Sequence, residues 1–225
     1  MKDLNQLIIK FHYDQNFRDD DFYVSKSNKH IYDKLFSWPK WEKNFLNISG
    51  DKFSGKSHLT NIFLKKFSGL RLDAKSLNNE NLSQVKLYAN IVLENLSENI
   101  DERILFSLLN IVEQENKYLV VTSKKSIVDI NFRLEDLRSR SKNFLLQNID
   151  KPDDELMFAL ILKNLSDRQI SLDKKLINYI IKRIDRSYGK IFDFIYKIDE
   201  ISLKKKKSID FKTIKEVLEE KVEQI

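Results

Sequence analysis

The sequence predicts an α/β protein in which helices flank a central parallel sheet, followed by a small domain built only of helices. Up to about residue 150, short apolar runs alternate with stretches of helical periodicity, and this alternation is typical of a parallel sheet covered by helices. Beyond residue 150 the apolar residues follow helical periodicity, and no further strand is predicted. A turn containing two glycines joins the first strand to the first long helix.

Five strands and two long helices are predicted in the first part of the chain. Each strand is a short apolar run with the length of a buried strand, and each helix repeats its apolar residues at helical spacing. The strands are residues 45–49, 70–72, 89–93, 118–122 and 144–146, and the helices are residues 57–67 and 102–115.

The second part of the chain is predicted to hold four helices, at residues 155–165, 173–184, 190–202 and 211–222. Pro152 is expected at the first position of the first of these helices, where the missing N–H of proline costs nothing. The opening residues are polar and lack sustained periodicity. We therefore expect a tail at residues 1–20, a sheet domain at residues 21–150 and a helical domain at residues 151–225.

Composition excludes several classes of protein. The 225 residues include no cysteine, so neither disulfides nor a cysteine zinc site are expected. No apolar run approaches the ~20 residues that cross a bilayer, so we expect a cytoplasmic protein without a membrane contact. The net charge of +6 comes from 40 basic and 34 acidic residues that are interleaved, and by itself it does not indicate a nucleic-acid binder.

The turn after the first strand carries a phosphate-binding motif. Residues Gly50–Ser57 match the P-loop pattern G-x-x-x-x-G-K-[ST] in full. Its glycines allow backbone N–H groups to surround phosphate oxygens at the positive end of the following helix. Lys56 is expected to reach the outer phosphates and the Ser57 hydroxyl to bind magnesium. The alternative is a chance glycine turn, but the motif stands between a strand and a helix, as it must.

Hydrolysis needs acidic side chains after a second apolar strand. Here residues 90–93 are followed by Glu94 and Asn95. Glu94 can contact the metal through water, whereas Asn95 has no charge with which to act as a base. The alternative is that both residues merely end a strand. We therefore expect a protein that binds ADP or ATP with Mg²⁺ but hydrolyses nucleotide poorly in isolation.

Several motifs together resemble one family. The Trp-Pro-Lys-Trp run at residues 38–41, the strand at 45–49 and the Gly-Lys-Ser-His-Leu run at 55–59 resemble the AAA+ module of the DnaA family, and most closely its shortened Hda branch. Residues 21–28 resemble the family segment that lines the adenine side of the nucleotide. The resemblance continues at residues 108–110, 136–140 and 158–173, and it covers most of the chain.

The resemblance implies functional positions. Arg140 matches the arginine finger that one subunit presents to the nucleotide of its neighbour, and a plain surface arginine is the alternative. Thr122 and Ser123 match the sensor of the terminal phosphate, although a polar strand end is common, and Lys190 replaces an arginine of the second sensor in a helical lid. The expected nucleotide contacts are Gly50, Asp51, Lys52, Phe53, Ser54, Gly55, Lys56, Ser57, His58, Tyr23, Val24 and Lys190, with Ser57 and Glu94 at the metal.

The tail resembles a second known sequence. Residues 6–11, Gln-Leu-Ile-Ile-Lys-Phe, resemble the peptide by which bacterial proteins dock on the DNA polymerase sliding clamp (β subunit). Such a peptide binds as an extended strand with its apolar side chains in pockets. The contacts are then expected from Gln6, Leu7, Ile9 and Phe11. An edge strand of the fold itself is the alternative.

The resemblance implies a negative regulator of DNA replication initiation, which binds DnaA and the sliding clamp and stimulates ATP hydrolysis by DnaA through Arg140 in trans. The alternatives are an AAA+ adaptor that only recruits a partner, and a DnaA- or DnaC-like loader ATPase. Sequence-specific DNA binding is not expected, because the chain ends at Ile225, where the initiator continues into a helix-turn-helix domain. A homodimer is left open.

Overall fold

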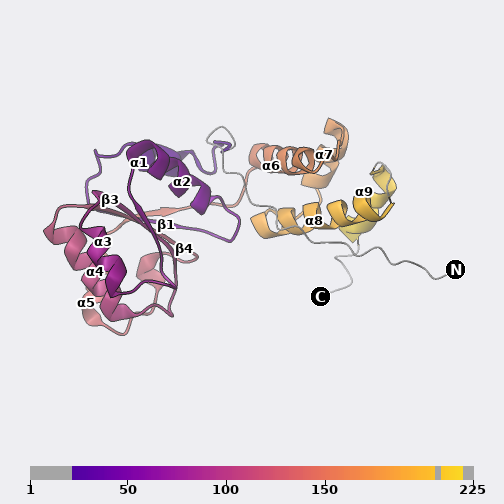
Figure 1. Cartoon of the computed structure of the whole chain (residues 1–225). Helices are drawn as coiled ribbons and strands as arrows, with labels where there is room; N and C mark the ends of the chain where they lie inside the picture. Colours follow the sequence, from indigo (N-terminus) through magenta and orange to yellow (C-terminus); the bar gives the residue numbers. More distant parts are fainter. Residues whose placement is uncertain (1–21, 206–208, 220–225) are drawn as a thin grey trace.

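The computed structural model describes residues 22–205 and 209–219 of the chain, and Figure 1 shows their arrangement. Five parallel strands form one sheet in the spatial order β2-β3-β4-β1-β5. The predicted parallel sheet is therefore confirmed. The strands are β1 (Phe45–Ser49), β2 (Leu70–Asp73), β3 (Asn90–Leu96), β4 (Tyr118–Ser123) and β5 (Leu145–Asn148).

Helices cover both faces of the sheet (Figure 1). On one face lie α1 (Lys29–Phe36) and α2 (Lys56–Phe67). On the other face lie α3 (Asn79–Val85), α4 (Glu102–Gln114), the short 3-10 helix η2 (Ile127–Asp129) and α5 (Glu135–Ser141).

Alternate residues of the inner strands β1, β3 and β4 contact different helices, because successive side chains point to opposite faces of a sheet. In β1, Leu46 and Ile48 pack in the core shared with α1 and α2, whereas Phe45 packs in the core shared with α3, α4 and α5. In β4, Val120 belongs to the first core and Val121 to the second. Since strands buried on both faces are apolar throughout, they appear as continuous apolar runs in the sequence.

The remaining helices form a group of their own beside the sheet (Figure 1). They are α6 (Asp154–Asp167), α7 (Lys174–Ile181), α8 (Tyr188–Lys205) and α9 (Phe211–Glu219). Side chains such as Met157, Ile177, Phe194 and Ile214 bury a separate core among them, which confirms the predicted all-helical region. None of the helices in residues 22–205 and 209–219 has the length and apolar character that crossing a membrane requires.

The start of α6 differs from the expectation for Pro152. The helix begins at Asp154, and Asp153 is its N-cap, with its carboxylate accepting a hydrogen bond from the Leu156 N–H at 2.8 Å. Pro152 precedes the cap, so its prediction as the first helical residue is wrong. The reason is that aspartate supplies the side-chain acceptor that a helix N-terminus needs, and proline does not.

Strand β3 continues beyond its predicted end at residue 93. Glu94 and Asn95 lie inside the strand, which runs to Leu96. The register with β4 shifts between Leu93 and Leu96, and Asn95 has a positive φ of 60°. This is a β-bulge, which absorbs an extra residue without ending the strand. The expectation that the strand ends before Glu94 and Asn95 is therefore wrong.

Asn47 is a fully buried polar residue in the middle of β1. Its side-chain amide donates to the Val121 carbonyl at 3.1 Å and to the Ser123 hydroxyl at 2.9 Å. Its carbonyl oxygen accepts from the Ile127 N–H at 2.9 Å. One side chain thus joins β1, β4 and η2 at the carboxyl edge of the sheet, beneath the P-loop.

We predict that Asn47→Ala lowers the free energy of unfolding by about 2 kcal/mol or more, because it leaves buried donors and acceptors without partners. Urea denaturation measures this loss. The matched control is Asn44→Ala, which removes only an exposed hydrogen bond to Asn116 and is expected to cost less than about 0.5 kcal/mol. Equal losses in the two variants would contradict the role given to Asn47.

Candidate nucleotide-binding site

The predicted P-loop joins the carboxyl end of β1 to the first turn of α2. Gly50 and Gly55 have φ angles of 156° and 92°, and Gly55 is the N-cap of α2. A Cβ on Gly55 would lie 3.1 Å from the Phe22 ring, and one on Gly50 would lie 3.0 Å from the Ser54 hydroxyl oxygen. The loop is therefore wound too tightly for larger residues, with the positive end of α2 at its centre. This geometry fits a phosphate group.

Lys56 folds back over this loop. Its ammonium donates to the carbonyl oxygens of Gly50 and Asp51, both at 2.7 Å. Burial lowers the pKa of Lys56, and the Asp51 carboxylate only partly opposes this effect. Because neutral carbonyls hold the ammonium, an anionic phosphate oxygen is a stronger partner for it than the ones it has.

The segment before α1 packs against the same loop. The Phe22 ring lies beside Gly55 and meets His58 edge-on at a centroid distance of 5.4 Å. Tyr23 and Val24 are exposed, and the Tyr23 hydroxyl donates to Glu155 of α6. That hydrogen bond raises the pKa of Tyr23. Phe22 is a loop contact that the sequence prediction missed, although it lies in the segment that resembles the adenine side of the family site.

Helix α8 reaches the loop from the helical region. Phe53 has a φ of 68° and stacks on Phe192 of α8, with ring centroids 4.7 Å apart. Tyr188, buried at the start of α8, donates to the Asp150 carbonyl at 3.1 Å. Burial raises the pKa of the Tyr188 hydroxyl. Lys190 is exposed in the first turn of this helix. No pattern in the sequence indicated Phe192, because a lone aromatic residue on a helix is ordinary.

Asp153 adds a further connection between the segment before α1 and the helical region. Besides capping α6, its carboxylate accepts a hydrogen bond from the Ser27 N–H at 3.1 Å. Burial acts to raise the pKa of Asp153, but the hydrogen bonds it accepts, the Leu156 N–H first among them, outweigh this and lower it. The segment before α1 is therefore attached to the start of α6.

Glu94 lies under the start of α2. Its carboxylate accepts from the Thr60 hydroxyl at 2.6 Å and pairs with Arg71 of β2 at 3.4 Å. The Thr60 hydroxyl oxygen also lies 3.1 Å from the Ser57 carbonyl oxygen, so the Thr60 side chain lies beside both expected metal residues. No group of three or more His, Asp or Glu in the described part of the chain could hold a metal alone. A magnesium ion here would take nucleotide oxygens and water besides Ser57 and Glu94.

The two expected sensor residues end β4, and both are buried. The Thr122 hydroxyl oxygen accepts a hydrogen bond from the Asn95 N–H at 3.2 Å. The Ser123 hydroxyl donates to the Lys125 carbonyl at 2.6 Å, and the Ser123 carbonyl accepts from the Gly50 N–H at 3.2 Å. The end of β4 is thus bonded directly to the first residue of the P-loop.

Arg140 lies on α5, which covers the opposite face of the sheet from α2 (Figure 1). Its guanidinium forms an ion pair with Glu113 of α4 and lies 5.1 Å from the ring centre of Phe106. The side chain is 28% exposed. The fold therefore does not gather Arg140 with the P-loop of its own chain.

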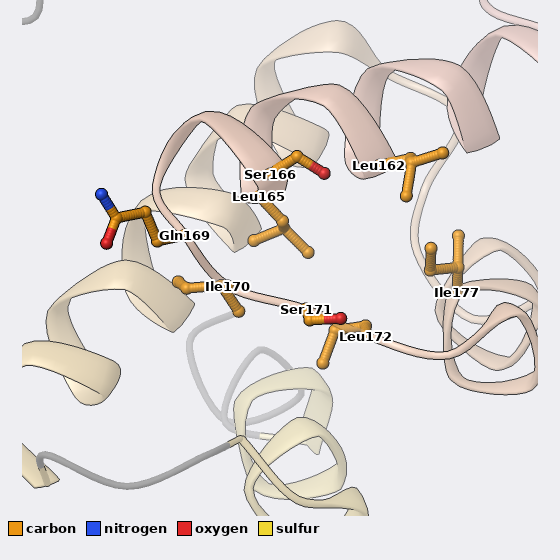
Figure 2. Close-up of a pocket in the computed structure, with 8 residues that line it drawn as sticks. All are labelled: Leu162, Leu165, Ser166, Gln169, Ile170, Ser171, Leu172 and Ile177. Atoms are coloured by element: carbon orange, nitrogen blue, oxygen red, sulfur yellow. The ribbon is translucent and has the colours of Figure 1, made fainter.

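A hollow of about 270 Å³ lies between the end of α6 and the start of α7 (Figure 2). Leu162, Leu165, Leu172 and Ile177 line it, and no cationic side chain does. It belongs to the helical region and does not fit a phosphate group. The expected clamp contacts Gln6, Leu7, Ile9 and Phe11 lie outside the described residues.

Comparison with known proteins finds a match for the helical region. A family model described as the lid domain of Hda matches residues 153–218. DnaA of Thermoanaerobacter sp. (strain X514) is 25% identical in an alignment 227 positions long, which covers 89% of this chain and 51% of that protein. The chain thus spans about half the length of this relative.

Solved structures identify the fold. Domain III of the Thermotoga maritima replication initiation protein DnaA has a TM-score of 0.73 at 17% identity, covering 92% of this chain and 97% of that one. AMPPCP-bound DnaA from Aquifex aeolicus has a TM-score of 0.66 at 19% identity, covering 82% and 64%. The fold is therefore that of the AAA+ P-loop module, followed by a helical lid.

We predict that Lys56→Met lowers the affinity for ADP and ATP by at least about tenfold, because it removes a charge-assisted hydrogen bond to phosphate. Isothermal titration calorimetry measures both affinities. Lys66→Met is the matched control, since Lys66 lies in the last turn of the same helix over the rings of Phe36 and Phe67. Equal affinities for the two variants would argue against a phosphate site in this loop.

Proposed function

We propose that this chain, an AAA+ protein related to Hda and DnaA, is a negative regulator of DNA replication initiation. In this proposal it holds an adenine nucleotide on the Gly50–Ser57 loop, docks on DnaA and on the sliding clamp, and presents Arg140 to the nucleotide held by DnaA. The partner then hydrolyses its own ATP. The match of residues 153–218 to the Hda lid carries the proposal, because it separates the chain from AAA+ proteins in general.

The loop supports the nucleotide part of this proposal. Glycines with positive φ, a helix N-terminus and a half-buried lysine meet at one point, and together they favour a phosphate chain. The Ser57 hydroxyl and Glu94 would hold a magnesium ion, which would neutralise phosphate charge. AMPPCP, bound by the DnaA structure of the same fold, makes an adenine nucleotide the natural candidate.

Slow hydrolysis by the chain itself also follows from the site. Asn95 is neutral, so it cannot take a proton from water as a carboxylate can. Glu94 is already hydrogen-bonded to Thr60 and paired with Arg71. Neither side chain is a free base beside the loop. The nucleotide of this chain is therefore proposed to act as a structural ligand.

The position of Arg140 supports action on a neighbour. Its helix lies across the sheet from the chain's own P-loop, so the guanidinium would serve a nucleotide held by another subunit. To do so it must leave Glu113. A partly exposed ion pair contributes only about 0–1 kcal/mol, whereas bidentate contacts of arginine with phosphate are stronger. The exchange is therefore favourable once a partner's phosphate is within reach.

An adaptor without a catalytic arginine is the second candidate. It is favoured by the contacts of Arg140 with Glu113 and Phe106, which give this side chain a structural role inside its own chain. A loader ATPase is a weaker candidate because of the neutral Asn95.

We predict that Arg140→Ala reduces the chain's stimulation of ATP hydrolysis by DnaA by about 10³-fold, the lower range for an arginine finger in GTPases. Hydrolysis is measured with DnaA and with clamp loaded on DNA. Arg138→Ala is the matched control, because Arg138 lies on the same helix in an ion pair with Glu135, and it should retain stimulation. If both variants stimulate DnaA like the unmodified chain, the adaptor is the correct function.

We predict that Gln6→Ala combined with Phe11→Ala lowers the affinity for the sliding clamp by at least about tenfold, because two anchors of the peptide are removed. Surface plasmon resonance with immobilised clamp measures this. Lys2→Ala combined with Lys10→Ala serves as the control within the same segment. Equal clamp affinity of the anchor variant and the unmodified chain would remove the clamp from the proposal and leave the contact with DnaA intact.

A further inference from the structure

The bulge in β3 controls the surroundings of Thr122. Leu93 pairs with Val121 and Leu96 with Ser123, so Glu94 and Asn95 together stand opposite Thr122. Asn95 takes a left-handed backbone conformation, with φ 60°. Its N–H leaves the regular ladder and donates to the Thr122 hydroxyl oxygen at 3.2 Å. Bulges of this kind re-aim groups next to functional sites.

Asp73 holds the bulge from the neighbouring strand. The Asn95 side-chain amide donates to one carboxylate oxygen of Asp73 at 2.6 Å. The other oxygen accepts from the Lys75 N–H at 2.8 Å. Both oxygens of Asp73 therefore act as acceptors at once. Asparagine is among the few non-glycine residues that tolerate the left-handed region, and here its side chain is fixed there by Asp73.

The side chains of Thr122 and Ser123, the last two residues of β4, point to opposite faces of the sheet. Thr122 shares its face with Val120, in the core beneath α2. On this same face the Glu94 carboxylate accepts the hydrogen bond from the Thr60 hydroxyl. Ser123 shares its face with Val121 and is bonded to Asn47 on the side of α3, α4 and α5. Only Thr122 is therefore on the face of the helix that begins at the P-loop.

The protons of the two hydroxyls are also used differently. The Ser123 proton is given to the Lys125 carbonyl at 2.6 Å. The Thr122 oxygen acts as an acceptor toward Asn95, and no hydrogen bond within residues 22–205 and 209–219 uses its proton. A hydroxyl has a single proton to donate. Thr122 can therefore donate to a further acceptor, and Ser123 cannot without losing a bond.

We propose that Asp73 and Asn95 are positioning residues of the nucleotide site, which orient the Thr122 hydroxyl so that Thr122, and not Ser123, donates to the terminal phosphate of an adenosine triphosphate. The inference rests on the proposed nucleotide binding. Thr122 then distinguishes triphosphate from diphosphate, because an ADP molecule lacks the oxygen that accepts its proton. Asp73 fixes the side chain of Asn95, and the Asn95 N–H orients the Thr122 hydroxyl. Neither Asp73 nor Asn95 is proposed to contact the nucleotide.

The test compares the affinities of the full chain for ADP and for the non-hydrolysable AMPPCP by calorimetry. Thr122→Val, which removes the proton at nearly constant size, should weaken AMPPCP binding about tenfold and change ADP binding less than about twofold. Thr122→Ser should restore the AMPPCP affinity. Asp73→Asn should act like Thr122→Val, because an amide must turn its NH₂ toward the N–H of Lys75 or toward Asn95.

Ser123→Ala is the control, and it should lower the melting temperature without changing the ratio of the two affinities. Equal losses for both nucleotides in Asp73→Asn would overturn the positioning role. A changed ratio in Ser123→Ala with an unchanged one in Thr122→Val would overturn the choice of Thr122. If the unmodified chain binds neither nucleotide, the proposed function fails together with this inference. If it binds both, and the ratio of the two affinities is the same in Thr122→Val and Asp73→Asn as in the unmodified chain, only the inference is overturned.

Discussion

The tight winding of the loop between β1 and α2 is the constraint on which the rest of the site depends. Two glycines with positive φ allow the chain to leave a buried strand and enter a helix within a few residues. Around this turn the parallel sheet brings the carboxyl ends of its other strands to the same edge. The end of β4 is hydrogen-bonded to Gly50, and Glu94 of β3 is bonded to the second turn of α2. The residues proposed to bind phosphate, to hold a metal and to act as a sensor thus lie at one edge of the sheet.

Much of the fold could be predicted because its signals are local. The inner strands β1, β3 and β4 are buried on both faces, so each appears as an apolar run. The P-loop is a contiguous motif whose context is a strand and a helix. The errors arose where a local rule met a competing one. Pro152 was expected to be the first residue of a helix, but Asp153 is the N-cap and Pro152 precedes it. A strand end was expected after residue 93, but β3 continues through a bulge at Asn95.

The pairs that define the site could not be predicted in the same way. Phe53 with Phe192, Glu94 with Arg71, and Asp73 with Asn95 join residues from different elements. Nothing in the sequence near either member of a pair names its partner, because such contacts follow from the sheet order and from the lid position. Arg140 shows the same limit. Its match to a finger is local, but its bond to Glu113 is known only from the fold.

The stacking of Phe53 on Phe192 couples the conformation of the Gly50–Ser57 loop to the position of α8. The ring of Phe53 in the loop packs on the ring of Phe192 on α8. Hydrogen bonds from Tyr23 to Glu155 and from Ser27 to Asp153 also join the segment before α1 to the start of α6. When sequences of relatives are compared, position 192 should be grouped with the glycine loop and not with the lid core. A smaller side chain at position 192 would remove the ring that Phe53 stacks on. The loop would then lose a contact although none of its own residues had changed.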